Sequence, residues 1–178
     1  MQIFASNKPK SKHSGFTLLE LMITLGIVGI LVAIGVPAMS DVIQRAQVRS
    51  EAQKYVGVLS LARSTAISEN QAVTIDFGGP GANGLRNVDV FSDTDGNQAF
   101  SGDDEYITQL ELEQSSLNVV IQSPPGSAGA AAASVSFDPN GRLIGTAIRI
   151  DIENGNQNLG RLIDVNLIGR ATVSEKTF

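Results

Sequence analysis

A continuous apolar segment constrains this chain more than any other feature. Residues 16–36 read FTLLELMITLGIVGILVAIGV and carry a single charge, on Glu20. As an α-helix, these 21 residues at about 1.5 Å each would reach roughly 31 Å, which matches the hydrocarbon core of a bilayer. The segment therefore predicts a helix that spans a membrane.

The charges on either side of the apolar segment orient it. Lys8, Lys10 and Lys12 precede the segment, and the first charge beyond it is Asp41. Because positive residues favour the cytoplasmic side, we expect a cytoplasmic N-terminus and export of the remaining chain. A removable signal peptide carries a small-residue cleavage site after its apolar region, and none is evident here.

Two details favour something more specific than a plain membrane anchor. An ionised Glu20 inside the span is costly unless it finds a partner, and a small polar junction, His13-Ser14-Gly15, stands in front of the span. The string G-F-T-L-L-E from Gly15 to Glu20, followed by an apolar helix with Pro37 near its end, resembles the class III signal of type IV pilins and type II secretion pseudopilins.

The resemblance implies how the N-terminus is processed. In that family a prepilin peptidase cuts after the glycine, the new N-terminal residue is methylated, and the apolar helix stays on the protein. Residues 1–15 are then the leader, the cut falls between Gly15 and Phe16, and Phe16 is the methylated N-terminus. Glu20 takes the role of the family's fifth-position glutamate.

The physical chemistry of Glu20 agrees with this role. Cleavage creates an α-amino cation on Phe16, and residues four apart share a helix face, so Glu20 gains a partner in its own chain or in a neighbour. Two alternatives remain open, a glutamate protonated in lipid and one that snorkels to the cytoplasmic interface. Because the pairing explains the position of Glu20 and the two alternatives do not, we assign Glu20 to filament assembly.

The helical pattern continues beyond the span. Pro37 lacks a backbone donor, so we expect it to kink or end the span, and we assign it to assembly as well. The transmembrane half of the helix is expected at residues 16–39 and an amphipathic half at residues 40–70. In the second half, apolar residues recur at steps of three and four while charged residues mostly avoid them; the apolar set is Val48, Ala52, Tyr55, Val56, Leu59, Ala62 and Ala66.

Beyond Asn70 the apolar period changes from helical to two. Alternation predicts half-buried strands, with turn-forming Gly, Pro and Asn between them, around residues 73–77, 88–90, 110–112, 117–121, 148–152 and 163–167. The fold class predicted is α+β. One long N-terminal helix packs on an antiparallel β-sheet or sandwich, which forms a periplasmic head of residues 71–178.

The head resembles the GspH/FimT family of minor pilins. The resemblance lies in Leu61-Ala62-Arg63-Ser64, in Phe137-Asp138-Pro139-Asn140-Gly141 and in Ile168-Gly169-Arg170. Some members of that family bind DNA through a G-R-x-R motif near the C-terminus. Here the corresponding residues 169–172 read GRAT, and after Asn70 six Lys or Arg stand against fourteen Asp or Glu. Such a head repels phosphate, so DNA as a partner is disfavoured.

Little in the composition supports catalysis or metal binding. The chain has no Cys, and its one His lies in the leader, which removes thiolate chemistry and the general base of a triad. The acidic stretch 93–105 matches a calcium loop only in part, because Gly96 is fourth where an EF-hand has glycine sixth. A calcium site and a solvated acidic loop both stay open. We expect no catalytic residues, no assigned metal ligands, no cofactor and no enzyme.

The sequence therefore predicts a minor pilin, a structural subunit of a type IV pilus that helps initiate or cap filament assembly. The alternatives are a type II secretion pseudopilin of the H type, a DNA-binding pilin of natural transformation, and a membrane-anchored β-domain if Gly15 is never cut. The expected partners are the prepilin peptidase, other pilins or pseudopilins, and the bacterial inner membrane. We expect a single-pass protein with a periplasmic head that later joins a pilus or pseudopilus.

Overall fold

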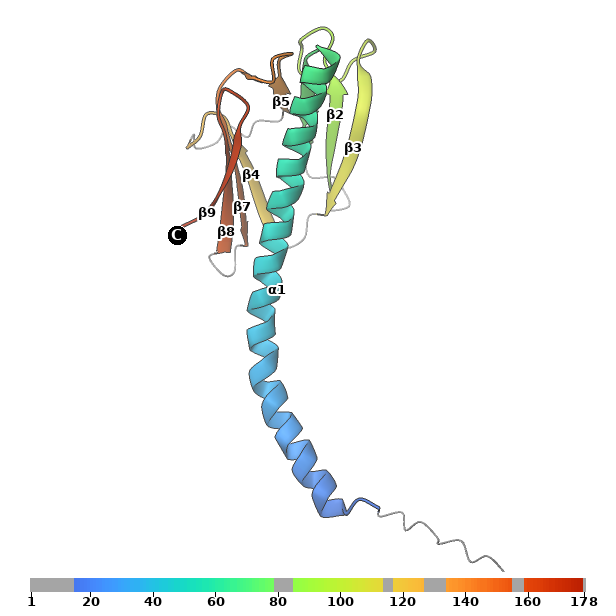
Figure 1. Ribbon diagram of the computed structural model, residues 1–178, viewed down its shortest axis with the longest axis vertical. Coiled ribbons are helices and arrows are strands. Elements are labelled where there is room, and N and C mark those ends of the chain that lie inside the picture. The colour runs from blue at the N-terminus through green and yellow to red at the C-terminus, as the bar shows by residue number, and fades with distance from the viewer. Residues whose placement is uncertain (1–14, 79–84, 114–116, 127–133, 155–158, 178) are drawn as a thin grey trace, which may run out of the picture. The chain divides into compact units, whose positions relative to one another are not determined.

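The computed structural model describes residues 15–78, 85–113, 117–126, 134–154 and 159–177. One α-helix and nine β-strands lie in these ranges (Figure 1). The chain divides into two compact units, Met1–Val42 and Ile43–Phe178. The predicted α+β class is confirmed.

The helix α1 runs from Leu18 to Glu69, 52 residues in all. It ends where Asn70 adopts a left-handed conformation with φ of 54°, and the Gln71 amide donates a hydrogen bond of 3.3 Å to the Ala66 carbonyl. This six-to-one bond after a left-handed residue is a Schellman C-cap, which Asn tolerates better than most residues. The change of apolar period after Asn70 therefore coincides with the true helix end.

The helical backbone also continues through Pro37. The continuation of the helix beyond Pro37 agrees with the expected second half, and a kink or the end of the membrane span at Pro37 stays a prediction. A proline removes one backbone donor, but the bonds on both sides of it persist because helix propagation is cooperative and needs no new nucleus.

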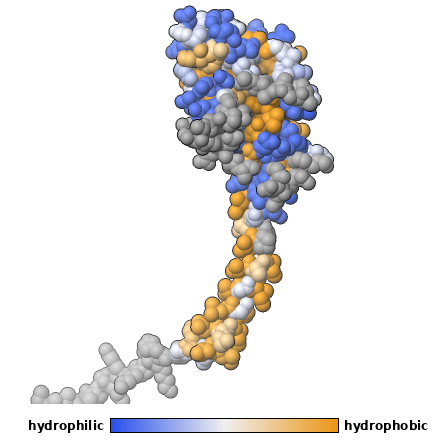
Figure 2. All heavy atoms as spheres, turned by 180° about the vertical axis from the view of Figure 1, so that it is seen from behind, coloured by the Kyte–Doolittle hydropathy of each residue, from blue (hydrophilic) through white to orange (hydrophobic). Residues whose placement is uncertain are grey.

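In the first unit the apolar side chains of α1 face outward. Every large apolar residue from Phe16 to Val36 is more than half exposed, and Figure 2 shows this part of the helix as almost continuously hydrophobic. The helix contains one candidate membrane span by length and hydropathy. The apolar surface predicted for the span thus has no partner among the described residues.

A five-stranded antiparallel sheet forms one part of the second unit. Its order is β3-β2-β1-β5-β6. The bounds are β1 Val73–Asp76, β2 Leu85–Ser92, β3 Glu105–Glu113, β5 Ser134–Phe137 and β6 Leu143–Ile144. Short β5 and β6 were not predicted, because two to four residues are too few for an alternation to be recognised.

A four-stranded antiparallel sheet forms the other part, in the order β4-β7-β8-β9. Its strands are β4 Leu117–Gln122, β7 Ile148–Asn154, β8 Leu159–Val165 and β9 Ala171–Glu175. Strand β9 was not predicted, since its central apolar residue, Val173, is flanked by Thr and Ser. The alternation assigned through Leu167 is wrong at its end: Leu167 is 50% exposed and lies in the turn after β8.

The core of the head joins the amphipathic half of α1 to both sheets. Of the predicted helix stripe, every residue is buried except the half-buried Val56. The Tyr55 ring packs on Phe77 at 6.0 Å between centroids. Glu51, which we placed off the stripe, is only 5% exposed, and its carboxylate pairs with Lys54 at 3.0 Å. Glu51 is thus buried next to the apolar stripe with its charge paired to Lys54, three residues later on the same side of the helix.

Candidate functional site

The start of α1 carries the residues that the sequence assigned to processing and assembly. Gly15, Phe16 and Thr17 precede the helix. The Thr17 hydroxyl accepts a hydrogen bond of 3.2 Å from the Glu20 amide, so Thr17 is the N-cap and Glu20 occupies the third helical position. Thr-x-x-Glu is the spacing of a capping box, and a carboxylate in the first turn is favoured by the helix dipole.

Thr17 is a functional candidate that the sequence reasoning missed. Its signal was present, since a Thr three residues before Glu at the head of an apolar run marks a helix start. In the uncleaved chain the nitrogen of Phe16 is an amide and carries no charge. The pairing of Glu20 with a Phe16 amino group therefore stays a prediction that applies after cleavage.

The junction at which we predict cleavage, between Gly15 and Phe16, is open in the structure. The Phe16 side chain is 81% exposed, and no atom lies within 4 Å of where a Cβ on Gly15 would be. The fold thus sets no limit on the size of residue 15. If a small residue is required there, the requirement comes from the peptidase.

A second cluster, in the head, surrounds Arg63. Its Nε donates a hydrogen bond of 2.8 Å to the Gly141 carbonyl, and its Nη2 donates one of 3.1 Å to the Ile168 carbonyl. One guanidinium thereby joins the exit of α1 to two loops that are 78 and 105 residues away in the sequence. The three segments that resemble the GspH/FimT family meet at this side chain.

The two loops bound by Arg63 are built alike. The loops are Asp138–Arg142 and Asn166–Arg170. In the first, the Asp138 carbonyl accepts a hydrogen bond of 2.8 Å from the Gly141 amide, and in the second the Asn166 carbonyl accepts one of 2.9 Å from the Gly169 amide. Both glycines are left-handed, with φ of 71° and 76°. In each loop the side-chain oxygen of the Asx residue also accepts from the amide of the final arginine. These are the same hairpin turn, with Gly required by its φ.

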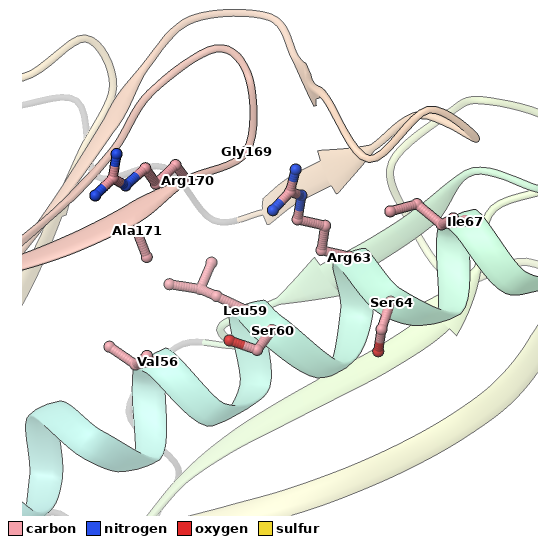
Figure 3. Close-up of a pocket in the computed structure, with 9 residues that line it drawn as sticks. All are labelled: Val56, Leu59, Ser60, Arg63, Ser64, Ile67, Gly169, Arg170 and Ala171. Carbon is pink, nitrogen blue, oxygen red and sulfur yellow. The ribbon is translucent and has the colours of Figure 1, made fainter.

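The turns also touch each other. The Leu143 amide donates to the Leu167 carbonyl at 3.0 Å, and a Cβ on Gly169 would overlap the Gly141 carbonyl oxygen. Beside them a hollow of about 330 Å³ opens between α1 and the start of β9. Figure 3 shows Arg63 rising from α1 next to Gly169, while the guanidinium of Arg170 points away from Arg63.

The acidic stretch 93–105 forms an ordered loop between β2 and β3. Oxygens of Asp93, Asp95 and Asp104 lie within 4.8 Å of one another, a spacing that could hold a cation. These oxygens already accept hydrogen bonds from the loop itself, including the Gly96 amide on Asp93 at 2.8 Å and the Thr94 amide on Asp104 at 2.9 Å. The bond from the Thr94 backbone is the main cause that lowers the pKa of Asp104 below its ordinary value of 3.8. The carboxylates thus bond to backbone groups of their own loop.

Phe100 explains how the loop is attached to the head. This residue fits poorly beside calcium ligands. Its ring packs edge-on against buried Phe91 at 5.5 Å and against Tyr106 at 4.2 Å. The aromatic ring therefore anchors the tip of the acidic loop to strands β2 and β3.

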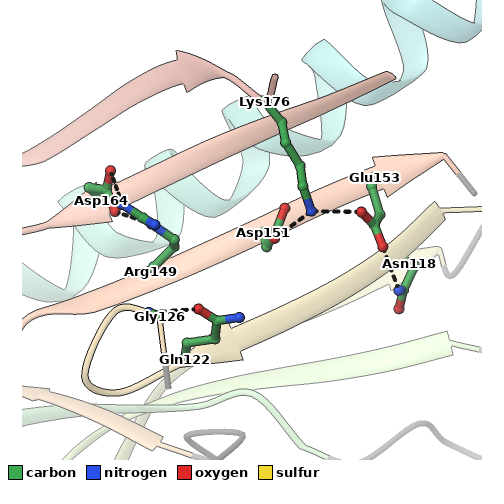
Figure 4. A network of polar contacts seen from close by, with 8 residues as sticks. All are labelled: Asn118, Gln122, Gly126, Arg149, Asp151, Glu153, Asp164 and Lys176. Carbon is green, nitrogen blue, oxygen red and sulfur yellow. Dashed lines mark hydrogen bonds and ion pairs between the residues drawn. The ribbon is translucent and has the colours of Figure 1, made fainter. Parts of the chain in front are cut away.

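A row of ion pairs covers the face of the four-stranded sheet that carries Arg149, Asp151 and Glu153. The Lys176 ammonium lies 2.7 Å from oxygens of both Asp151 and Glu153, and Arg149 pairs with Asp164 at 2.6 Å (Figure 4). The hydrogen bond from Lys176 lowers the pKa of Glu153 below its ordinary value of 4.5. The bond to Asp164 raises the pKa of Arg149. The row links the chain after β9 to the centre of the sheet.

Both the N-terminal segment and the head of this chain are similar to known proteins. A family model for the prokaryotic N-terminal methylation motif matches residues 10–36, and the model of Type II transport protein GspH matches residues 51–169. Prepilin peptidase-dependent protein D of Escherichia coli (strain K12) is 36% identical over 70 residues, covering 39% of this chain and 48% of that protein. Type IV major fimbrial protein FimA of Dichelobacter nodosus is 34% identical over 93 residues, covering 52% and 59%. The chain thus spans about half the length of these curated relatives.

The fold of the head also has a solved counterpart. The crystal structure of the type IV minor pilin FimU of Pseudomonas aeruginosa superposes with a TM-score of 0.56 at 20% identity, covering 74% of this chain and 90% of that chain. The GspH model covers well over half of the chain, from the buried face of α1 to the second of the two turns bound by Arg63. The protein therefore belongs to the GspH family of minor pilins and pseudopilins.

Proposed function

We propose that this protein is a minor pilin, a structural subunit of a type IV pilus that helps initiate or cap filament assembly. One observation carries the proposal: every large apolar side chain from Phe16 to Val36 is exposed. Burying a Leu or Ile side chain stabilises by about 1.5–3 kcal/mol, so such a surface must be covered by lipid or by other subunits. In a filament subunit, lipid covers this surface before assembly and other subunits cover it afterwards.

Processing would prepare the subunit for this exchange. The open junction at Gly15 is accessible to the prepilin peptidase, and cleavage would leave Phe16 as a methylated N-terminus. The new amino cation then lies near Glu20, one turn along. Their pairing would neutralise Glu20 as it leaves the membrane interface and enters the apolar bundle of helices.

The subunit would be stored in the bacterial inner membrane with its head in the periplasm. The candidate span in α1 and the position of the lysines before it support this arrangement. The partners would be the prepilin peptidase and other pilins. Members of these families are structural subunits, and the role proposed for this chain is structural.

Similarity to FimU and to FimA favours the pilus. The description of the matching family model, Type II transport protein, favours a type II secretion pseudopilin as a second candidate. Deleting the gene distinguishes them. If the protein is a pilus subunit, the deletion reduces the number of surface filaments and leaves secretion of exported enzymes unchanged. If it is a secretion pseudopilin, the deletion reduces secretion and leaves the number of surface filaments unchanged.

The deletion strain is complemented with the wild-type gene and with Gly15→Asp. The intact mass of the wild-type protein should lack residues 1–15 and carry an added methyl group, and it should restore filament number. Gly15→Asp should stay uncleaved and should not restore filaments, although it is inserted in the membrane. A mature protein that retains its leader beside an active peptidase would refute the proposal.

A further inference from the structure

A groove runs along the head between one side of α1 and the edge strand β9. It consists of three adjacent hollows, the two larger of about 350 and 330 Å³. The helix side advances from Arg45 to Ile67 while the strand side runs back from Lys176 to Gly169. This order is that of one seam between two antiparallel elements, which we call the α1–β9 groove.

The α1–β9 groove is basic in a head that is acidic. Among the described residues that line it, six are Lys or Arg and one, Glu175, is acidic. After Asn70 the chain has six Lys or Arg against fourteen Asp or Glu, and three of those six basic residues line this groove: Arg161, Arg170 and Lys176. The Lys176 ammonium is already paired with Asp151 and Glu153, so the positive charge along this seam comes from the arginines.

Several of these charges have no counterpart in the head. Arg63 bonds two carbonyls, and Arg161 pairs with Glu175 at 3.0 Å. Within the described ranges, the guanidinium groups of Arg45, Arg49 and Arg170 form no hydrogen bond or ion pair. Arg45 and Arg49 are also four residues apart on one helix face, where like charges repel. An acidic partner would relieve that repulsion.

The floor of the groove is apolar. Ala52 is buried, Val56 is half-buried, and Val173 of β9 remains 49% exposed although its cross-strand neighbour Ile163 is fully buried. The core of the head thus continues into the groove and ends there in an open apolar strip. An occupant with both carboxylates and apolar side chains would match the walls and the floor.

We propose that the α1–β9 groove docks an acidic, partly apolar segment of a different, neighbouring subunit of the filament. The proposal rests on the proposed function for the presence of such a neighbour. A second copy of this chain fits poorly, because oxygens of Asp93, Asp95 and Asp104 in its acidic loop already bond to that loop. Nucleic acid fits poorly too, because the head as a whole repels a polyanion and no aromatic residue among the described lining can stack on a base.

The test places a photo-crosslinking amino acid at Gln53, which is exposed and lines the groove, in the full-length protein in its own cells. The matched control position is Ser174, on the opposite face of β9. Crosslinked peptides are mapped by mass spectrometry in the wild-type background, in Arg45→Glu/Arg49→Glu and in Arg45→Lys/Arg49→Lys. Arg142→Glu, an exposed charge change outside the groove, is the control for charge alone.

We expect Gln53 to capture an Asp/Glu-containing segment of another pilin or pseudopilin, and Ser174 not to do so. The double Glu variant should lower this yield about tenfold, the double Lys variant and Arg142→Glu should keep it, and all should remain equally abundant in membranes. An unchanged yield in the double Glu variant overturns the proposal. So does capture of a second copy, of nucleic acid, of a segment without acidic residues, or of nothing.

This readout is separate from the proposed function. The crosslink is formed in intact cells and does not require a sheared surface filament. A gene deletion that affects secretion instead of piliation would refute the pilus role and leave the crosslink in place. Loss of the crosslink with normal piliation would refute only the docking of the segment.

Discussion

Two stretches of the same helix differ in what covers their apolar side chains. From Phe16 to Val36 all large apolar residues are exposed, whereas from Val48 to Ala66 the apolar stripe is buried against two sheets. From Leu18 onward both stretches belong to the one helix α1. The comparison teaches that the same secondary structure can suit two environments. How far the apolar surface extends around the helix decides whether it packs in a protein core or needs lipid or other helices. A stripe suits a protein core, and an apolar cylinder needs lipid or other helices.

The sharpest way to break this comparison is to truncate one apolar side chain in each stretch. Tyr55→Ala removes a ring that is 1% exposed and packed on Phe77, so we expect the head to lose about 3–5 kcal/mol of unfolding free energy. Leu25→Ala, in the exposed stretch, should leave that free energy unchanged. Denaturant unfolding of the detergent-extracted protein, followed by near-ultraviolet circular dichroism, measures both.

Equal losses of unfolding free energy in Tyr55→Ala and Leu25→Ala would refute the difference between the two stretches of α1. The head alone should also fold, because the unit Ile43–Phe178 contains the whole described core. Repeating the Tyr55→Ala measurement on that fragment should give the same loss. Non-cooperative melting of the wild-type fragment would show instead that the head depends on the first unit.

The second prediction concerns the charge in the exposed stretch. Glu20→Ala removes the carboxylate proposed to pair with the Phe16 amino group after cleavage, and leaves the Thr17 cap in place, since that bond uses the Glu20 amide. An unpaired cation in an apolar bundle costs several kcal/mol, so the ratio of this subunit in filaments to that in inner membranes should fall at least about tenfold. Glu20→Gln should behave similarly because it also lacks the charge.

Leader cleavage and head stability should be unchanged in both Glu20 variants. The matched control is Thr17→Ala, which removes the N-cap at about 1 kcal/mol but keeps both charges, so it should reduce incorporation much less. An unchanged ratio in Glu20→Ala would exclude charge pairing as the route into the filament.

The third prediction tests what holds the helix exit in the head. Arg63→Met keeps the side-chain volume but leaves the Gly141 and Ile168 carbonyls without their donor, so we expect a loss of about 1–3 kcal/mol in head stability. Arg63→Lys should recover only part of it, because an ammonium cannot reproduce the planar fork. Unfolding midpoints of the three proteins give the comparison, and equal midpoints would show that the carbonyls are satisfied by water.

The smallest effect is a pH dependence confined to the head. The pKa of Glu153 is lowered by Lys176, so its contribution is present above the ordinary pKa of 4.5 and is lost as the pH falls through the lower folded-state pKa. Glu153→Gln should therefore flatten the acid side of the stability curve below about pH 4.5, by about 0.5 kcal/mol. Thermal unfolding between about pH 6 and pH 3 measures the slope.

Lys176→Met should flatten the same slope, and adding Glu153→Gln to it should change little more. Additive effects of the two substitutions would mean that the pair observed at 2.7 Å contributes nothing in solution.

Long periodic segments were predicted well. The helix end at Asn70, the buried stripe and six of the strands followed from periods of 3.6 and 2, because side-chain direction along a regular element depends only on position. Strands β5, β6 and β9 were missed, being too short or too polar for a period. The capping role of Thr17 was also missed, although its spacing to Glu20 is a local signal that a search for capping boxes would find.

The sequence by itself determined the features that depend on neighbours along the chain: the apolar surface of the span, the carboxylate of Glu20 within it and the family to which they point. The cleavage junction at Gly15 stays a prediction. Only the tertiary structure decided that Arg63 binds two similar turns and that uncompensated arginines of α1 and of the turn before β9 line one groove of an acidic head. The reason is physical. Contacts between residues 78 to 105 positions apart depend on sheet order and on the path of the chain, which leave no period in the sequence.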